Sequence, residues 1–187
     1  MSKESKEQRV LELFFNEPTK HWRFSKITET ADLAENKVSK WLKKFQNEGL
    51  IQRVKSQKKM PYYIAKYDSS HYVHAKLLFG LQKFYETGLL DHLSSLEKAK
   101  TVILFGSFSR GDWYSGSDID IFIYGVEENQ PLGLGKFYFK LHREIQVFSG
   151  NNADDLKKIG GPLLRSILKG IRIKGNIPSE VWKHALT

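Results

Sequence analysis

Hydrophobic residues near the start of the chain recur at the spacing of an α-helix. Over residues 6–16, one stripe contains Val10, Leu11, Phe14 and Phe15, and Pro18 lies just beyond the end of the segment. Apolar residues three to four positions apart mark the buried face of an amphipathic helix, and proline is common just after a helix end. The pattern therefore predicts a first helix over residues 6–16.

Two more helices and two strands are predicted before residue 67. A short helix over residues 26–31 is expected to be capped by Ser25, because a serine hydroxyl accepts a hydrogen bond from the free amides of a first helical turn. Residues 35–47 show the apolar spacing of a third helix. Residues 51–55 and 62–66 then have the composition of two short strands. Three helices followed by a hairpin are expected.

The rest of the chain mixes helical and strand patterns. A long helix is expected from Ser69 or Ser70, with these apolar residues facing inward: Val73, Leu77, Leu81, Phe84 and Tyr85. Further segments have helical spacing at residues 89–97, 132–142 and 162–169, and strand patterns at 101–105, 118–124, 143–148 and, as an edge strand, 171–173. Because the pattern changes near residues 67–70, we expect one domain over residues 1–68 and a second over residues 69–187.

Composition excludes several classes of protein. The 187 residues are 40% hydrophobic and contain no cysteine, which argues against a disordered chain, a disulfide-stapled secreted scaffold and thiolate metal sites. No apolar run approaches the roughly 18 residues of a membrane span, and the first residues lack the apolar region of a signal peptide. We expect a soluble, cytoplasmic protein with no membrane partner.

Positive charge is concentrated in the first third of the chain. The formal net charge is +9, and residues 1–66 hold 15 Lys and Arg against 8 Asp and Glu. Such an excess favours a polyanionic partner for this part of the chain. The cations are densest from residue 36 to residue 59, on the third predicted helix and the hairpin loop.

If the apolar positions of the third helix point inward, its outer face carries polar side chains that a helix in a DNA major groove would present. The candidate DNA contacts are Asn36, Lys37, Lys40 and Lys44 on this helix and Lys55, Lys58 and Lys59 in the loop. Residues 5–66 resemble the winged helix-turn-helix domains of bacterial and archaeal transcription regulators, which implies binding of double-stranded DNA, with a homodimer expected. An ordinary solvated helix face and a protein-contact surface are the alternatives.

The segment between the strands at 101–105 and 118–124 carries the clearest chemistry. Gly106 and Ser107 follow the first strand, and Asp118 and Asp120 lie two residues apart, so both carboxylates project from one face of the second strand. Two carboxylates on one face repel each other, and a divalent cation compensates them. A glycine lets the backbone approach a phosphate closely, and a serine offers a hydroxyl and an amide. The pattern predicts a site where a cation joins the carboxylates to a nucleoside triphosphate (NTP).

These residues resemble the minimal nucleotidyltransferases of the DNA polymerase β-type superfamily. The matching features are Gly106-Ser107, Arg110-Gly111 and Ser117-Asp118-Ile119-Asp120, and the resemblance extends over about residues 72–175. It implies that Asp118 and Asp120 are catalytic and bind Mg²⁺, with Mn²⁺ as a substitute, and that Gly106, Ser107, Arg110 and Ser117 contact the NTP. Pairing of Arg110 with Asp112 is the structural alternative. We therefore expect an α+β protein in which a winged helix-turn-helix precedes a mixed sheet flanked by helices.

The sequence departs from this family at its third carboxylate. The position on the following strand reads Gln146, a neutral amide, and Glu144 lies about 6.5 Å earlier on the same face. Either Glu144 substitutes as the third catalytic acid, or one metal binds well and turnover is weak or absent.

Two functions follow as hypotheses. The first is Mg²⁺-dependent transfer of a nucleoside monophosphate (NMP) to an unknown hydroxyl; resemblance to the antitoxin nucleotidyltransferases would imply a toxin-like protein as acceptor, and a small molecule or a nucleic acid end are the other candidates. The second is a DNA-bound transcriptional regulator or antitoxin-like protein that binds nucleotide without robust turnover. The intact Gly-Ser and Asp-x-Asp motifs favour the first, and Gln146 favours the second.

Overall fold

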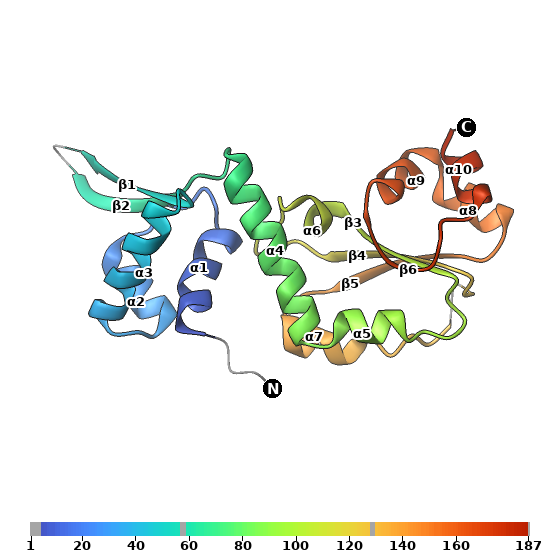
Figure 1. Cartoon of the computed structure of the whole chain (residues 1–187), viewed down its shortest axis with the longest axis horizontal. Coiled ribbons are helices and arrows are strands. Elements are labelled where there is room, and N and C mark those ends of the chain that lie inside the picture. Colours follow the sequence, from blue (N-terminus) through green and yellow to red (C-terminus); the bar gives the residue numbers. More distant parts are fainter. Residues whose placement is uncertain (1–4, 57–58, 128–129, 187) are drawn as a thin grey trace. The chain divides into compact units, whose positions relative to one another are not determined.

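The computed structural model describes residues 5–56, 59–127 and 130–186 and divides into two compact units (Figure 1). The first unit contains the chain up to Lys76 together with residues 113–115, and the second contains the rest. Helix α4, Ser70–Glu86, begins in the first unit and ends in the second. The expected domain boundary after residue 68 stays a prediction, since the division into units falls later, inside α4.

The first unit has the element order expected from the sequence. Its helices are α1 (Lys6–Asn16), α2 (Phe24–Ala31) and α3 (Glu35–Asn47), followed by strands β1 (Ile51–Ser56) and β2 (Lys59–Ala65). The two strands form an antiparallel pair. The bounds of α1 and α3 agree with the predicted ones, because each has a regular apolar stripe.

The start of α2 corrects the expected cap at Ser25. The helix begins two residues earlier than predicted, and the capping position is Arg23, whose side chain makes no capping hydrogen bond. Trp22 and Tyr63 exchange two backbone hydrogen bonds of 2.8 Å, which hold the chain extended up to the helix start. Ser25 therefore lies inside the first turn, because tertiary pairing decides where the helix begins.

The core of the first unit forms between α1, α3 and the first turns of α4. The apolar stripe of α3 is buried as expected, and so are Phe14 and Phe15 of α1. The Tyr72 hydroxyl donates to the Phe14 carbonyl at 2.7 Å, and the Tyr72 ring meets the Phe15 ring edge to face. Trp113 also lies in this core, with its ring centroid 6.2 Å from that of Phe15.

The buried face of α4 agrees only in part with the predicted one. Phe84 is buried as expected, and Val73, Leu77 and Leu81 are half-buried, but Tyr85 is 65% exposed. Tyr72, Lys76 and Phe79 are buried and were not predicted to be. Lys76 can be buried because its ammonium donates to the Trp113 carbonyl and lies 4.6 Å from the centroid of the Trp113 ring. The apolar pattern correctly predicted that α4 is a helix, but its tertiary contacts determine which of its side chains are buried.

The second unit is built on a four-stranded mixed sheet. The strands are β3 (Thr101–Phe105), β4 (Ile119–Tyr124), β5 (Ile145–Gly150) and β6 (Ile171–Lys174), in the order β5-β4-β3-β6. β4 and β5 are parallel, whereas β3 is antiparallel to both β4 and β6. The α+β class and the edge position of β6 are confirmed.

Helices flank this sheet, and one of them was not predicted. They are α5 (Leu89–Ser94), α6 (Gly106–Arg110), α7 (Gly135–Leu141), α8 (Ala153–Ile159), α9 (Gly161–Leu168) and α10 (Ser179–Leu186). The acidic pair Asp154 and Asp155 indicated a helix start and lies in the first turn of α8. α10 was not predicted, because it is only two turns long, which is too short for a distinct period.

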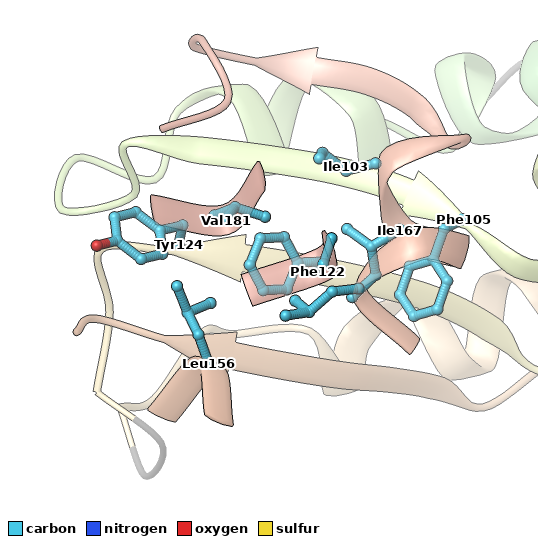
Figure 2. Close-up of a cluster of buried hydrophobic side chains, with 9 residues drawn as sticks. Ile103, Phe105, Phe122, Tyr124, Leu156, Ile167 and Val181 are labelled. Atoms are coloured by element: carbon cyan, nitrogen blue, oxygen red, sulfur yellow. The ribbon is translucent and has the colours of Figure 1, made fainter. Parts of the chain in front are cut away.

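Both faces of the sheet are covered. Figure 2 shows Ile103, Phe122 and Tyr124 packed against Leu156 of α8 and against residues of the last two helices, and Figure 1 shows α5 and α7 on the other side of the sheet. Five of the six residues of β4 are buried, and the exception is Asp120. Because a charged side chain in an otherwise buried strand is costly unless it has a role, the end of β4 that carries Asp120 is the candidate functional site.

Candidate active site

Asp120 lies directly beside the turn that follows β3. In the antiparallel register Asp120 is paired with Phe105, and Gly106 comes next along the chain. Gly106 has φ +71°, and a Cβ atom at this position would collide with the Asp120 carboxylate. Only glycine satisfies both requirements, so the sheet register and the turn together place a carboxylate against bare backbone.

The Asp120 carboxyl is held in an environment that disfavours its negative charge. Partial burial raises its pKa, the nearby negative charge of Asp118 raises it further, and the positive charge of Arg110 opposes them. These effects require Asp118 and Arg110 to lie close to Asp120. The structure therefore brings together the two predicted carboxylates, the glycine turn and Arg110.

This pair of carboxylates fits a hard divalent cation. Mg²⁺ is usually bound through one or two carboxylates and completes its coordination with water and substrate phosphates. No group of three His, Asp or Glu side chains in the described part of the chain could hold a metal by itself. A cation bound at Asp118 and Asp120 would thus depend on ligands from a substrate, and it would relieve the repulsion that raises the pKa of Asp120.

Ser107 and Arg110 lie on α6, the short helix that begins at this turn. In the part of the chain that the structure describes, the Ser107 hydroxyl has no hydrogen-bond partner. The Nε atom of Arg110 donates to Oδ2 of Asp112 at 2.8 Å, and both side chains are more than half exposed. The expected alternative pairing is present, yet it occupies one edge of a guanidinium group that has five N–H donors.

On the neighbouring strand β5, the residue beside Asp120 is Gln146, whose side chain is a neutral amide. Asp120 is paired with Gln146 in the parallel register of β4 and β5. Glu144 lies just before β5, where its backbone carbonyl accepts from the amide of Ile119 at 2.9 Å and its side chain is exposed. Since no metal-holding group of three acids was found among the described residues, Glu144 as the third acid stays a prediction.

Arg143 contributes to the site and was not foreseen. Its Nη1 atom donates to the Ser117 carbonyl at 2.8 Å, and its guanidinium carbon lies 5.1 Å from the centroid of the Phe108 ring. The side chain thereby joins α6 to the loop that carries Ser117 and Asp118. An arginine in a loop gives no periodic signal, so only the contacts reveal this positioning role.

The candidate DNA contacts of the first unit are only partly described. Asn36, Lys37 and Lys40 are exposed on α3, and Lys55 is exposed on β1. Lys44 is also exposed, but its ammonium is 2.6 Å from Glu7 and 3.6 Å from Glu48. Lys58 and the side chain of Lys59 lie outside the described residues.

Comparison with known proteins identifies the type of domain that contains the Gly106 turn and β4. Residues 87–160 match the family model of the nucleotidyltransferase domain. This range contains the Gly-Ser turn, both carboxylates and Gln146. The match supports a nucleotidyltransferase-type domain here and, in general terms, a transferase function.

No curated protein and no solved structure was similar enough to add a relative to this comparison. A membrane span is also missing from the described residues, where every helix is too short or too polar to cross a bilayer.

Proposed function

We propose that the chain is a Mg²⁺-dependent nucleotidyltransferase that transfers an NMP from an NTP to a hydroxyl group. The observation that carries the proposal is the position of Asp120 against the Gly106 turn, with Asp118 near enough to disfavour the charge of Asp120. The raised pKa of Asp120 and the family match at residues 87–160 support it. Mn²⁺ would satisfy the same oxygen ligands.

In the proposed reaction, the acceptor oxygen forms a bond to the α-phosphorus while the bond from that phosphorus to pyrophosphate breaks. Asp118 and Asp120 would hold the metal, which supplies neutralisation of the phosphate charge when bound. The Ser107 hydroxyl and the Arg110 guanidinium would bind and orient the phosphates. We propose Glu144 as acceptor of the hydroxyl proton, because a neutral amide at Gln146 cannot take it.

A specific observation favours a second candidate. The neutral Gln146 lies directly across from Asp120 in the sheet, at the position where a third carboxylate would help the reaction. A site with two carboxylates still suits binding of a metal–nucleotide complex. The alternative is therefore a DNA-bound regulator or antitoxin-like protein that binds the nucleotide and turns it over slowly or not at all.

For the first unit we propose a DNA-binding winged helix-turn-helix. The order of α1, α2, α3 and the β1–β2 hairpin supports it. So do the exposed polar side chains on α3 opposite its buried stripe. Lys44 would have to exchange its contact with Glu7 for a phosphate, so Lys37 and Lys40 are the stronger candidates.

The test is transfer of label from α-labelled ATP, GTP, CTP and UTP, each with Mg²⁺ and a cell extract as the source of acceptor. We expect wild-type protein to label an acceptor and the double variant Asp118→Ala/Asp120→Ala to lose at least about 100-fold of the rate, as expected when the metal ligands are removed. Asp91→Ala, an exposed carboxylate on α5, is the control and should keep full activity. Nucleotide binding that requires Mg²⁺ but gives no transfer would favour the second candidate, and no nucleotide binding would refute both.

A further inference from the structure

A cationic hollow opens next to the candidate active site. It has a volume of about 350 Å³, within the range of small-molecule sites, about 300–1,000 Å³. It is lined by Ser109, Arg110, Pro162, Arg165, Ser166 and Lys169, and we call it the α9 hollow. Its lining includes three cations and two hydroxyls and no carboxylate, which is the chemistry of an anion site.

The lining comes from two short elements that face each other. Pro162, Arg165, Ser166 and Lys169 follow the spacing of a single helix face along α9 and its C-terminal cap, while Leu164 and Ile167 on the other face are buried in the core. Ser109 and Arg110 come from the end of α6. Cations near a helix C-terminus are common because they interact with the helix dipole. That rule explains neither the arginine from α6 nor the cavity between them.

The α9 hollow adjoins the Gly-Ser turn. Gly170 follows Lys169 and packs so closely on β3 that a Cβ atom there would collide with the Leu104 carbonyl and lie 2.9 Å from Cβ of Phe105. Phe105 directly precedes Gly106. Arg110 lines the hollow, and its positive charge also opposes the rise in the pKa of Asp120. The hollow and the two carboxylates therefore share the same end of β3.

The cations of the hollow retain free hydrogen-bond donors. The Lys169 ammonium has no hydrogen-bond or ion-pair partner among the described residues. Arg165 is held in place by a hydrogen bond from Nη1 to the Ala185 carbonyl at 2.7 Å, and Arg110 uses only Nε toward Asp112. Arg165 is thus fixed by α10, and Lys169 is available for a ligand.

We propose that the α9 hollow binds the pyrophosphate portion of the NTP, with Lys169 and Arg165 contacting the β- and γ-phosphates. The inference rests on the proposed function and deepens it, since it assigns the leaving group to Arg165 and Lys169, which lie outside the matched range 87–160. Because the three phosphates of an NTP are covalently joined, a site for the β- and γ-phosphates must adjoin the carboxylates, as the α9 hollow does. The three cations offset the negative charge that pyrophosphate takes with it.

The experiment measures binding of inorganic pyrophosphate with Mg²⁺ to the full chain by isothermal titration calorimetry. We expect Lys169→Ala to weaken binding about 10-fold or more, the effect of losing one charge-assisted hydrogen bond, and Lys169→Arg to restore most of it. The matched control is Lys98→Ala, an exposed lysine three residues before β3 and thus at the opposite end of that strand from Gly106. It makes the same change in net charge and should bind as wild type does.

The outcomes separate this inference from the proposed function. If the chain transfers NMP but Lys169→Ala binds pyrophosphate as wild type does, the hollow proposal is wrong and the transferase proposal stands. Equal weakening by Lys98→Ala and Lys169→Ala also overturns it, because net charge alone would then explain the effect.

Two further results complete the test. If pyrophosphate binds in a Lys169-dependent manner to a chain that transfers no nucleotide, the anion site is supported and the transferase proposal fails. Lys169-dependent binding of a 5′-phosphorylated oligonucleotide without binding of pyrophosphate would assign the hollow to an acceptor and overturn the proposal.

Discussion

At the scale of single residues, the candidate site depends on Gly106 and on the Asp120 carboxylate, whose negative charge is disfavoured by its surroundings. Burial and Asp118 raise the pKa of Asp120, so the folded chain binds that proton more tightly than the unfolded chain does. The free energy of unfolding of the metal-free protein therefore falls as the pH rises from the ordinary pKa of an aspartate toward the raised pKa of Asp120. A bound cation would favour the ionised Asp120 carboxylate, so metal binding would stabilise this end of the sheet.

Gly106→Ala is expected to damage both the fold and the site. An alanine is strained at φ +71°, by about 1–2 kcal/mol, and its Cβ would also displace the Asp120 carboxylate. Gly49→Ala is a matched control, because Gly49 has φ +72° but no neighbouring atom within 4 Å of an added Cβ. Thermal unfolding should show a larger loss for Gly106→Ala. Only this variant should lose Mg²⁺-dependent nucleotide binding, and retained binding would contradict the geometry described for the site.

The sequence predicted those site residues whose chemistry follows from spacing along one segment. Asp118 and Asp120 were recognised because strand geometry places residues two apart on one face, and Gly106 because a turn at a phosphate site requires glycine. Arg143 was missed because its role arises from contacts with Ser117 and Phe108, far away in the chain, and the proposed role of Lys169 was missed because the hollow that it lines forms only where α9 meets α6. No local pattern distinguishes either of them from an ordinary surface cation.

At the scale of elements, register determines which groups meet. The antiparallel pairing of β3 with β4 places the turn beside Asp120, and the parallel pairing of β4 with β5 places Gln146 on its other side. The strands were predictable to within a few residues, because their apolar runs are distinctive. α10 was not, and its position depends on contacts such as the hydrogen bond from the Tyr124 hydroxyl to Glu180, 2.6 Å long.

Tyr124→Phe is expected to loosen α10 from the sheet. The hydrogen bond to Glu180, together with burial, raises the pKa of Tyr124 to about 12. Its loss should cost about 0.5–1.5 kcal/mol near neutral pH. Because the unfolded chain releases this proton at a lower pH than the folded chain, the stabilising contribution is complete below the ordinary tyrosine pKa and is lost as the pH rises toward 12.

Thermal unfolding of wild type and Tyr124→Phe at several pH values checks this prediction. The difference between their melting temperatures should shrink above about pH 10, the ordinary tyrosine pKa. Tyr138→Phe is the control, since Tyr138 is 48% exposed and its hydroxyl has no hydrogen-bond partner among the described residues. A constant difference across this pH range would rule out the proposed contribution of the Tyr124 proton.

At the scale of the whole molecule, the two units differ in charge as well as in architecture. Most of the +9 net charge comes from the first 66 residues, which contain 15 basic and 8 acidic side chains. This asymmetry, visible in the sequence, favours a polyanion as partner of the first unit. How the chain divides between the units could not be predicted, because the inclusion of residues 113–115 in the first unit depends on tertiary contacts.

Binding to double-stranded DNA should weaken steeply with salt if the first unit acts as proposed. Each phosphate contact contributes about one unit to the slope of log affinity against log salt concentration. Lys37→Ala/Lys40→Ala should lower affinity and reduce that slope by up to about two units. Fluorescence anisotropy with a labelled duplex measures both quantities, and Lys98→Ala/Lys183→Ala, in the second unit, is the charge-matched control. Undetectable binding, or binding indifferent to salt, would favour a protein-contact role.

The assignment of residues 113–115 to the first unit limits how the protein can be divided for experiments. A fragment ending at Lys76 would lack the Trp113 ring that packs on Phe15 and the carbonyl that accepts from the Lys76 ammonium. It would thus expose apolar surface and leave a buried lysine without this acceptor, a combination that promotes aggregation. The complementary fragment would retain the tryptophan without the core it belongs to. Roles of the halves are therefore better separated by point substitutions in the intact polypeptide than by truncation.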